Sequence, residues 1–349
     1  MRIEQHNMRV LQVMAGAEFG GAEAFFTRLV IALRRAGLHQ GVVIRKNEHR
    51  ASLLRDGGIE PVEFRFGGPL DVMTRMRMRR EIASFSPHIV MTWMNRATSM
   101  CPKGDFVHIA RLGGYYDPKY YQNCHHLIGN TQDIVEYLTG EGWPKEQAHY
   151  LPNFVSAEIA APLAREDYYT PKDAPLLLAL GRLHENKAFD VLLDALGRLP
   201  DAYLWLAGEG PKRGELEAQA EKLGIKPRVR FLGWRDNISA LLASCDVFVC
   251  PSRHEPLGNV VVEAWAQSKP VVAADSLGPG MLIKQEENGV LVPIDDAKSL
   301  AYAIGQVIKD ENLRSRIALH GRATYEEHFT EEMVVSQYLN FFESLIKAD

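Results

Sequence analysis

Residues 253–273 read RHEPLGNVVVEAWAQSKPVVA and form the most informative stretch of the chain. The residues just before it, 246–251, form a short β-branched and aromatic run that ends in a proline, which is typical of a buried strand. Gly258 and Asn259 then open an apolar run over 260–267 that predicts a helix. Strand, loop and helix in this order are the repeating unit of an open α/β sheet, in which ligands bind beyond the carboxyl ends of the strands.

Two glutamates of this stretch, Glu255 in the loop and Glu263 in the helix, indicate the kind of ligand. The start of the helix would present the backbone N–H groups of Leu257, Gly258, Asn259 and Val260. These donors favour an anion, whereas a carboxylate accepts strongly from hydroxyl groups. A nucleotide sugar, which is anionic in one part and rich in hydroxyls in others, satisfies both requirements. The simpler interpretation is a capping acid followed by an exposed helix acid, and the spacing alone leaves both open.

A second loop complements these glutamates. Residues 181–187, GRLHENK, directly follow a predicted strand at 176–179. Arg182 and Lys187 stand on either side of this loop and could clamp a diphosphate, the arginine as a planar fork and the lysine as a mobile point charge. Surface cations occur in most loops, but the position at the carboxyl end of a strand favours ligand binding.

With these residues the chain resembles the large family of retaining glycosyltransferases of the GT-B architecture, often called family 4, whose signature is two glutamates separated by seven residues. The resemblance covers nearly the whole chain and is most specific over residues 181–293. It implies an α/β fold of two Rossmann-like doubly wound domains that face each other across a cleft. The chain departs from the family at Ala188, where glycine is usual. We expect little harm from this methyl group, because it removes no hydrogen-bond donor.

The resemblance also implies roles for these residues. Arg182 and Lys187 are expected to stabilise the departing diphosphate, together with the start of the helix. Glu255 is expected to hold the hydroxyls of the transferred sugar and Glu263 those of the ribose, so that Arg182, Lys187 and Glu255 are the candidate catalytic residues. The chain has no Asp-x-Asp motif, with which other transferase folds hold a metal ion. Neither a metal nor another cofactor is therefore expected.

The composition is that of an ordinary globular protein. The chain has 349 residues, of which 46% are hydrophobic and 24% charged, and this length allows two domains with cores of their own. No apolar run approaches the roughly 18 residues of a membrane span, and residues 8–14 already read as a buried strand. The four cysteines form no C-x-x-C pair. We therefore expect a cytoplasmic protein, with the inner face of the membrane as an alternative location.

Strand and helix patterns alternate in two series that are separated by a polar, proline-marked stretch at 162–175. The predicted strands of the first series are 9–14, 41–45, 88–94, 106–110 and 125–129, and those of the second are 176–179, 203–207, 229–232, 247–250, 271–274 and 289–292. We predict an acceptor-binding domain over 1–160 and a donor-binding domain over 171–329. A C-terminal helix within 330–349 is expected to pack back on the first domain, as the resemblance implies.

Two glycine-rich loops differ in how strongly they indicate ligand binding. Residues 16–21 end in Gly20 and Gly21 before a helix and resemble the family's GGAE loop, whose backbone approaches the donor diphosphate. A flexible turn is the alternative. Gly208, Gly210 and Gly214 come close to a dinucleotide fingerprint, but the third spacing is wrong and no acidic residue ends the next strand. A tight strand-to-helix turn is therefore the better interpretation of this second loop.

The first domain offers further candidates. Many relatives place a histidine just after a central strand, near the transferred sugar, whereas His108 lies inside the strand pattern at 106–110. Either His108 is a strand histidine and Arg111, past the predicted end of the strand, takes its task, or the histidine is displaced. Asn95, Tyr115 and Tyr116 are candidate contacts of the acceptor, because sugars stack on aromatic faces.

Charge is divided unevenly along the chain. Residues 1–155 carry 19 Lys and Arg against 15 Asp and Glu, net +4, and the remainder carries 21 against 29, net −8. The basic half could favour an anionic acceptor or a weak peripheral membrane contact, with local support from residues 69–82, PLDVMTRMRMRREI. An amphipathic surface helix is the simpler interpretation of that segment. Nucleic acid is not an expected partner.

These features predict a metal-independent, retaining glycosyltransferase of the hexosyltransferase type. Its donor would be a nucleotide-diphosphate sugar, with a UDP sugar favoured, and its acceptor a glycan or glycolipid in the synthesis of bacterial lipopolysaccharide or another surface glycan. Three alternatives remain: a nucleotide-sugar epimerase of the same architecture, an NAD-dependent oxidoreductase, and a non-catalytic nucleotide-sugar binding protein. The paired glutamates argue against the first, and the spacing after Gly208 argues against the second.

Overall fold

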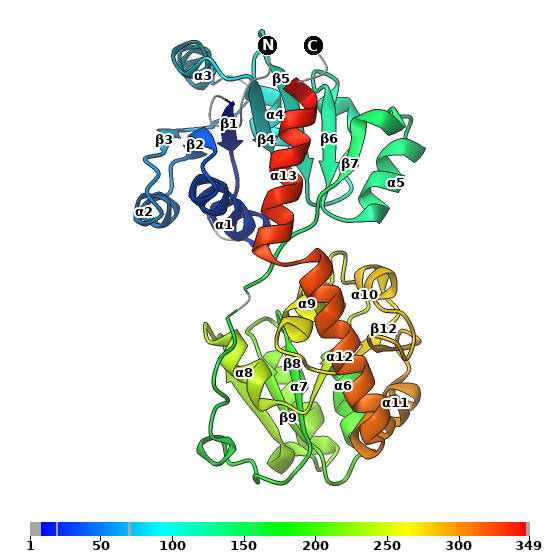
Figure 1. Cartoon of the computed structure of the whole chain (residues 1–349). Helices are drawn as coiled ribbons and strands as arrows, with labels where there is room; N and C mark the ends of the chain where they lie inside the picture. Colours follow the sequence, from blue (N-terminus) through cyan, green and yellow to red (C-terminus); the bar gives the residue numbers. More distant parts are fainter. Residues whose placement is uncertain (1–7, 19, 69–70, 157, 347–349) are drawn as a thin grey trace. The chain divides into compact units, whose positions relative to one another are not determined.

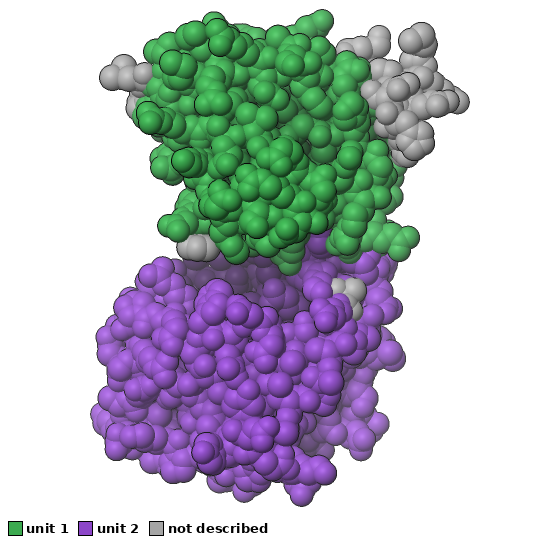
Figure 2. Space-filling model, turned by 90° about the vertical axis from the view of Figure 1, so that its left-hand side faces the viewer, with its two compact units in different colours: residues 1–153, 331–349 green, residues 154–330 purple. Residues whose placement is uncertain are grey.

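The computed structural model describes residues 8–346, apart from residues 19, 69–70 and 157. The chain divides into two compact units, which are coloured separately in Figure 2. Unit 1 comprises residues 1–153 and 331–349, and unit 2 comprises residues 154–330. Residues 154–170, which the sequence analysis divides between the first domain and a connection, thus belong to unit 2.

Unit 1 is built on a seven-stranded parallel sheet with the strand order β3-β2-β1-β4-β5-β6-β7 (Figure 1). The strands are β1 (Arg9–Met14), β2 (His39–Arg45), β3 (Val62–Phe64), β4 (Ile89–Trp93), β5 (Val107–Leu112), β6 (His126–Gly129) and β7 (Ala148–Tyr150). The helices are α1 (Gly21–Arg35), α2 (Glu48–Asp56), α3 (Val72–Phe85), α4 (Met94–Met100), α5 (Gln132–Gly140) and α13 (Glu331–Ile346), with 3₁₀ turns η2 (Pro118–Tyr121) and η3 (Lys145–Gln147). Strand β4 is buried along its whole length, which explains why Thr92 is its only polar residue.

Unit 2 has a six-stranded parallel sheet with the order β10-β9-β8-β11-β12-β13. The strands are β8 (Leu176–Leu180), β9 (Tyr203–Ala207), β10 (Val229–Gly233), β11 (Val247–Cys250), β12 (Val271–Ala274) and β13 (Val290–Val292). The helices are α6 (Phe189–Leu196), α7 (Arg213–Lys222), α8 (Ile238–Ser244), α9 (Asn259–Ala266), α10 (Leu277–Leu282), α11 (Ala297–Lys309) and α12 (Glu311–His328), with 3₁₀ turns η4 (Arg165–Tyr168), η5 (Glu185–Lys187) and η6 (Lys226–Arg228). The predicted α/β class and the two doubly wound sheets are confirmed.

The differences from the sequence-based prediction lie in unit 1. Strands β3 and β7 were not predicted, because each is three residues long with a polar residue, Glu63 or His149, at its centre and so forms no apolar run, unlike the equally short β13. Strand β5 continues to Leu112, whereas the apolar pattern predicts an end at residue 110. Arg111 therefore lies within the strand rather than beyond it.

The last helix, α13, packs beside α1 in unit 1 (Figure 1). Its Tyr338 is fully buried, and the hydroxyl accepts a hydrogen bond from Nε of Arg111 at 2.7 Å. Glu331 forms an ion pair with Arg35 of α1 at 2.6 Å. Residues 347–349 of the predicted C-terminal segment lie outside the described residues.

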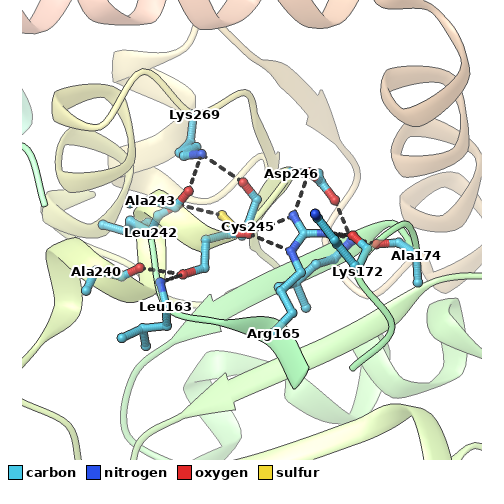
Figure 3. A network of polar contacts seen from close by, with 12 residues as sticks. Leu163, Arg165, Lys172, Ala174, Ala240, Leu242, Ala243, Cys245, Asp246 and Lys269 are labelled. Atoms are coloured by element: carbon cyan, nitrogen blue, oxygen red, sulfur yellow. Dashed lines mark hydrogen bonds and ion pairs between the residues drawn. The ribbon is translucent and has the colours of Figure 1, made fainter. Parts of the chain in front are cut away.

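Arg165 connects the segment that leads into β8 to the residues between α8 and β11 (Figure 3). Its guanidinium donates to the carbonyl oxygens of Lys172, Ala174 and Ser244, and it pairs with Asp246 at 2.8 Å. Lys269, on the opposite side of this network, donates to two further backbone carbonyls. These side chains line a hollow of about 950 Å³ at the amino ends of β8, β11 and β12. Because the two cations are bound to backbone oxygens, we assign them a structural role.

Candidate active site

The strand order of unit 2 places two loops beside each other. Strands β8 and β11 are neighbours, although β9 and β10 lie between them in sequence, so the order of strands reverses at this point. At such a switch point the connections leave toward opposite faces of the sheet and open a crevice at the carboxyl ends. The loop after β8 carries Arg182 and Lys187, and the loop after β11 carries Glu255.

Lys187 and Glu255 form an ion pair between these two loops. The Nζ atom of Lys187 contacts Oε2 of Glu255. The Glu255 side chain is 10% exposed and that of Lys187 is 21% exposed, so both charges are largely removed from water. Removal of one partner from such a largely buried ion pair would leave the charge of the other uncompensated.

Helix α9 begins next to this pair. Gly258, the residue before the helix, has a φ of 65° and provides no capping side chain. A methyl group at this position would come within 2.6 Å of Leu282 Cδ1. The left-handed backbone and the close packing therefore both require glycine. The N–H groups of the first turn and the positive end of the helix dipole face the edge that carries Glu255.

The remaining predicted donor residues of unit 2 lie at the same edge. Glu263 is half-buried in α9, and Leu257, Asn259 and Val260 are half-buried at its start. Arg182 is exposed, and within the described part of the chain it has no carboxylate partner. A cation at such a position can reorient toward a ligand at low cost.

Ala188, which stands where the family usually has glycine, adopts a left-handed backbone conformation. Its φ is 50°, and it is the residue before α6. A left-handed conformation costs a residue with a side chain on the order of 1 kcal/mol. The alanine methyl is buried, so packing offsets part of this strain.

Arg253 lies beside the same two loops, although no motif in the sequence marks it as a candidate. Its guanidinium forms a two-pronged ion pair with Asp190 of α6 and a further pair with Asp295, which follows β13. Burial raises the pKa of the Asp190 carboxyl, but the hydrogen bonds and charge of Arg253 outweigh this effect and hold the pKa below its ordinary value. The arginine stands two residues before Glu255, but no pattern in the sequence connects it to partners so far along the chain.

The glycines after β9 support the loop that carries Arg182. Gly208 has a φ of 147°, and a methyl group there would overlap the carbonyl oxygen of Gly181. A methyl group on Gly210 would likewise overlap the carbonyl of Leu183. These glycines are required for contact between two loops of the protein, in agreement with a tight turn and not with a dinucleotide fingerprint.

In unit 1 the glycine loop before α1 is held by two buried charged side chains. Oε1 of Glu23 accepts a hydrogen bond from Ala17 N at 2.7 Å. Nη2 of Arg50 donates to the carbonyl of Ala17 at 2.7 Å and to that of Glu18 at 3.2 Å. A methyl group on Gly20 would overlap the Glu23 carboxylate, whereas Gly21 has open space around its Cα. Phe19, within the same loop, lies outside the described residues.

His108 and Arg111 lie in the interior of unit 1. His108 is 3% exposed, its Nε2 lies 3.1 Å from Thr92 Oγ1, and burial lowers its pKa to about 4. Arg111 is 2% exposed, donates to Tyr338 and Asn153, and lies against aromatic rings of α1 and β4. The expectation that Arg111 stands past the end of its strand was wrong. Its buried position favours a role in holding α13 rather than a contact with a sugar.

The other candidates of unit 1 are more accessible. Asn95 is exposed in α4, directly after β4. Because the strand order of unit 1 reverses between β1 and β4, Asn95 and the glycine loop lie on either side of the switch point. Burial raises the pKa of Tyr116, and the nearby Glu23 carboxylate adds to the effect. Tyr115 is 42% exposed and its hydroxyl donates to Asp133.

Two further observations concern metals and membranes. Among the residues that the structure describes, no group of three or more His, Cys, Asp and Glu side chains is arranged to hold a metal ion. In the same part of the chain, no helix combines the length and the apolar character that a membrane crossing requires.

Comparisons with known proteins identify the family. Residues 162–324 match the family model described as Glycosyl transferases group 1. The chain is 38% identical to the lipopolysaccharide core biosynthesis glycosyltransferase LpsE of Rhizobium meliloti, over 93% of this chain and 96% of the relative. It is 36% identical to LpsD of the same organism, over 96% of this chain and 98% of the relative. The chain therefore belongs to the Glycosyl transferases group 1 family, and it is a glycosyltransferase.

Solved structures agree with this fold. The Anabaena protein Alr3699/HepE in complex with UDP-glucose matches with a TM-score of 0.80 at 22% identity, over 97% of this chain and 100% of the other. A glycosyltransferase from Rickettsia africae matches with a TM-score of 0.86 at 18% identity, over 98% and 99% of the two chains. The two parallel α/β sheets are thus those of the GT-B fold.

Proposed function

We propose that this protein transfers a sugar from a UDP sugar to a hydroxyl of a lipopolysaccharide core acceptor, with retention of the anomeric configuration and without a metal ion. The observation that carries the proposal is the Lys187–Glu255 ion pair at the start of α9, on the switch point of unit 2. The names of LpsE and LpsD support the acceptor, and the UDP-glucose complex of Alr3699/HepE supports the donor.

The geometry supports different roles for the cations and the glutamates when the bond between the sugar and the diphosphate breaks. Departure of the diphosphate leaves positive charge on the sugar and places negative charge on the leaving group. Lys187, Arg182 and the N–H groups at the start of α9 supply positive potential for the leaving group. Glu255 accepts from hydroxyls of the transferred sugar and Glu263 from the ribose. Glu255 is therefore not assigned as a covalent nucleophile.

A thermal-shift experiment tests the donor site. We expect UDP to stabilise the protein equally with and without EDTA, because side chains and backbone supply the positive field. At about 100 times its dissociation constant the nucleotide adds about 2.7 kcal/mol to the free energy of unfolding. The Lys187→Ala variant should show a smaller shift at the same UDP concentration. Stabilisation that disappears with EDTA, or a larger shift with NAD than with UDP, would contradict the proposal.

The residues that we propose to contact the acceptor belong to unit 1. We propose that the glycine loop at 16–21 approaches the donor diphosphate and that Asn95, Tyr115 and Tyr116 contact the acceptor. Transfer from UDP sugars to isolated lipopolysaccharide core, with the product's anomeric configuration determined by NMR, tests both the acceptor and retention. An inverted product or the absence of transfer to any core acceptor would contradict this assignment.

Helix α3 supports a weak contact with the inner face of the membrane. Val72 and Met73 are each 63% exposed and Met76 is 44% exposed, and the arginines at 75, 79 and 80 are exposed beside them. Apolar and basic side chains together favour a surface of anionic lipid. Sedimentation with phosphatidylglycerol vesicles should carry the protein down at low salt, and Met73→Glu should reduce this fraction. Equal binding to neutral vesicles would contradict the assignment.

A further inference from the structure

Arg253 joins three segments of unit 2 through one guanidinium. Nη1 and Nη2 donate to Oδ1 and Oδ2 of Asp190 at 2.9 and 2.6 Å, and Nε lies 2.6 Å from Oδ1 of Asp295. Nη1 also donates to the carbonyl oxygen of Glu185 in η5 at 2.9 Å. All three nitrogens are therefore engaged by the protein itself, so Arg253 is not a ligand-binding cation in this arrangement.

These contacts lie between the turn of Lys187 and the loop of Glu255. The backbone N–H of His254 donates to the carbonyl of Asn186 at 3.1 Å. Two consecutive residues of the Glu255 loop thus bind two consecutive carbonyls of the turn that ends in Lys187. The ion pair between Lys187 and Glu255 is the next connection between the same two segments.

The strength of the Arg253 contacts is modest, but their geometry is specific. The side chain of Arg253 is 27% exposed and that of Asp190 is 46% exposed, so solvent screens the attraction. A fork of two parallel N–H donors on one carboxylate nevertheless fixes direction as well as distance. A lysine could replace the charge but not the fork. Such contacts act mainly by limiting the positions of the loops that they connect.

We propose that Arg253 is a positioning residue of the transfer site, which holds the turn of Lys187 against the loop of Glu255 so that both side chains meet the donor in one arrangement. The inference rests on the proposed function of Lys187 as a ligand of the donor diphosphate. It predicts that Arg253 influences diphosphate binding through Lys187 and not through a contact of its own.

A double-mutant cycle tests this coupling. The dissociation constant of UDP is measured by calorimetry for the wild type, Arg253→Ala, Lys187→Ala and the double variant. We expect each single variant to bind UDP about 5- to 20-fold more weakly and the double variant to bind no more weakly than Lys187→Ala, because groups that act as one unit are not additive. Losses that multiply in the double variant would overturn the proposal.

Two further variants separate positioning from general stability. Arg165 is a matched control, because it also ties separate segments of unit 2 through a carboxylate and backbone carbonyls, but at the opposite edge of the sheet. Arg165→Ala should lower the melting temperature and leave the UDP dissociation constant within about twofold of the wild type. If Arg165→Ala loses as much UDP affinity as Arg253→Ala, both losses reflect a general destabilisation of unit 2, and the positioning role of Arg253 is overturned.

Conservative changes keep the test decisive if Arg253→Ala does not fold. Asp190→Asn keeps the shape of the carboxylate but removes its charge, and it should weaken UDP binding in the same direction. Arg253→Lys should not restore affinity, because it cannot form the fork, and full restoration would overturn the proposal. If Lys187→Ala binds UDP as the wild type does, the proposed donor site fails. If Lys187→Ala weakens binding and neither Arg253→Ala nor Asp190→Asn does, only the positioning role fails.

Discussion

Lys187 and Glu255 are paired with each other in the structure, and we expect binding of the donor to separate them. In the structure the two charges neutralise each other at the start of α9. A diphosphate is a stronger partner for the ammonium group than one carboxylate, because it carries more charge. We therefore expect the donor to draw Lys187 toward its phosphates and to leave Glu255 available for sugar hydroxyls.

This arrangement predicts that the two glutamates respond differently to substitution. Glu263→Ala should weaken both free UDP and the UDP sugar, because a hydrogen bond between a hydroxyl and a carboxylate contributes on the order of 1.5 to 3 kcal/mol. Glu255→Ala should leave UDP affinity unchanged or raise it, because Lys187 loses a competitor, and should mainly lower turnover. Calorimetry with UDP and steady-state kinetics separate the two effects. Equal losses of UDP affinity in both variants would reverse the assignment.

Some glycines of the helix and strand ends are closely surrounded by neighbouring atoms, whereas others have room for a side chain. Gly208 and Gly258 are enclosed by neighbouring atoms and have positive φ angles, so substitution there disturbs the fold of unit 2. Gly21, at the first position of α1, has no atom within 4 Å of an added Cβ and is exposed. A glycine without a packing reason at the carboxyl edge of a sheet is consistent with the approach of a ligand.

Gly21→Val should therefore fold as the wild type does but transfer sugar much more slowly, because the branched side chain obstructs the donor diphosphate. Gly140→Val is a matched control, since Gly140 also has open space but ends α5. Circular dichroism and the melting temperature check the fold, and initial rates check transfer. Wild-type rates in a folded Gly21→Val would show that the loop does not touch the donor.

For the molecule as a whole, the buried His108 and the half-buried His149 predict that stability depends on pH. Burial lowers the pKa of His108 and of His149 to about 4, from an ordinary value near 6.5. Between these values the unfolded chain binds more protons than the folded chain, so the free energy of unfolding rises with pH. The stabilising contribution is complete above pH 6.5 and is lost as the pH falls toward 4.

We expect the denaturant midpoint to fall steadily between pH 6.5 and 4, and His108→Asn to reduce this slope. The asparagine is polar but carries no group that titrates in this pH range. Urea titrations at several pH values measure the slope for both proteins. An identical slope in the variant would show that His108 does not titrate in the unfolding reaction.

Much of the proposed donor site could be predicted from the sequence, because its residues lie in two short loops after recognisable strands. Lys187 and Glu255 lie in the loops that follow the apolar strands β8 and β11, and parallel strands bring their carboxyl ends to one edge. The order β8-β11, which makes the two loops neighbours, is a property of the folded sheet. The short strands β3 and β7 could not be predicted, since a polar central residue interrupts each three-residue strand and leaves no apolar run.

The α/β class, the family resemblance and the residue types of the two loops can be read from local patterns of apolar, glycine and charged residues. Which side chains meet depends on how the chain packs in three dimensions. Arg253 gains Asp190 from a helix 63 positions away, and Arg111 is turned inward to Tyr338, 227 positions away. Such contacts arise when sheets and helices pack, and no local pattern encodes them because the partners share no periodicity along the chain.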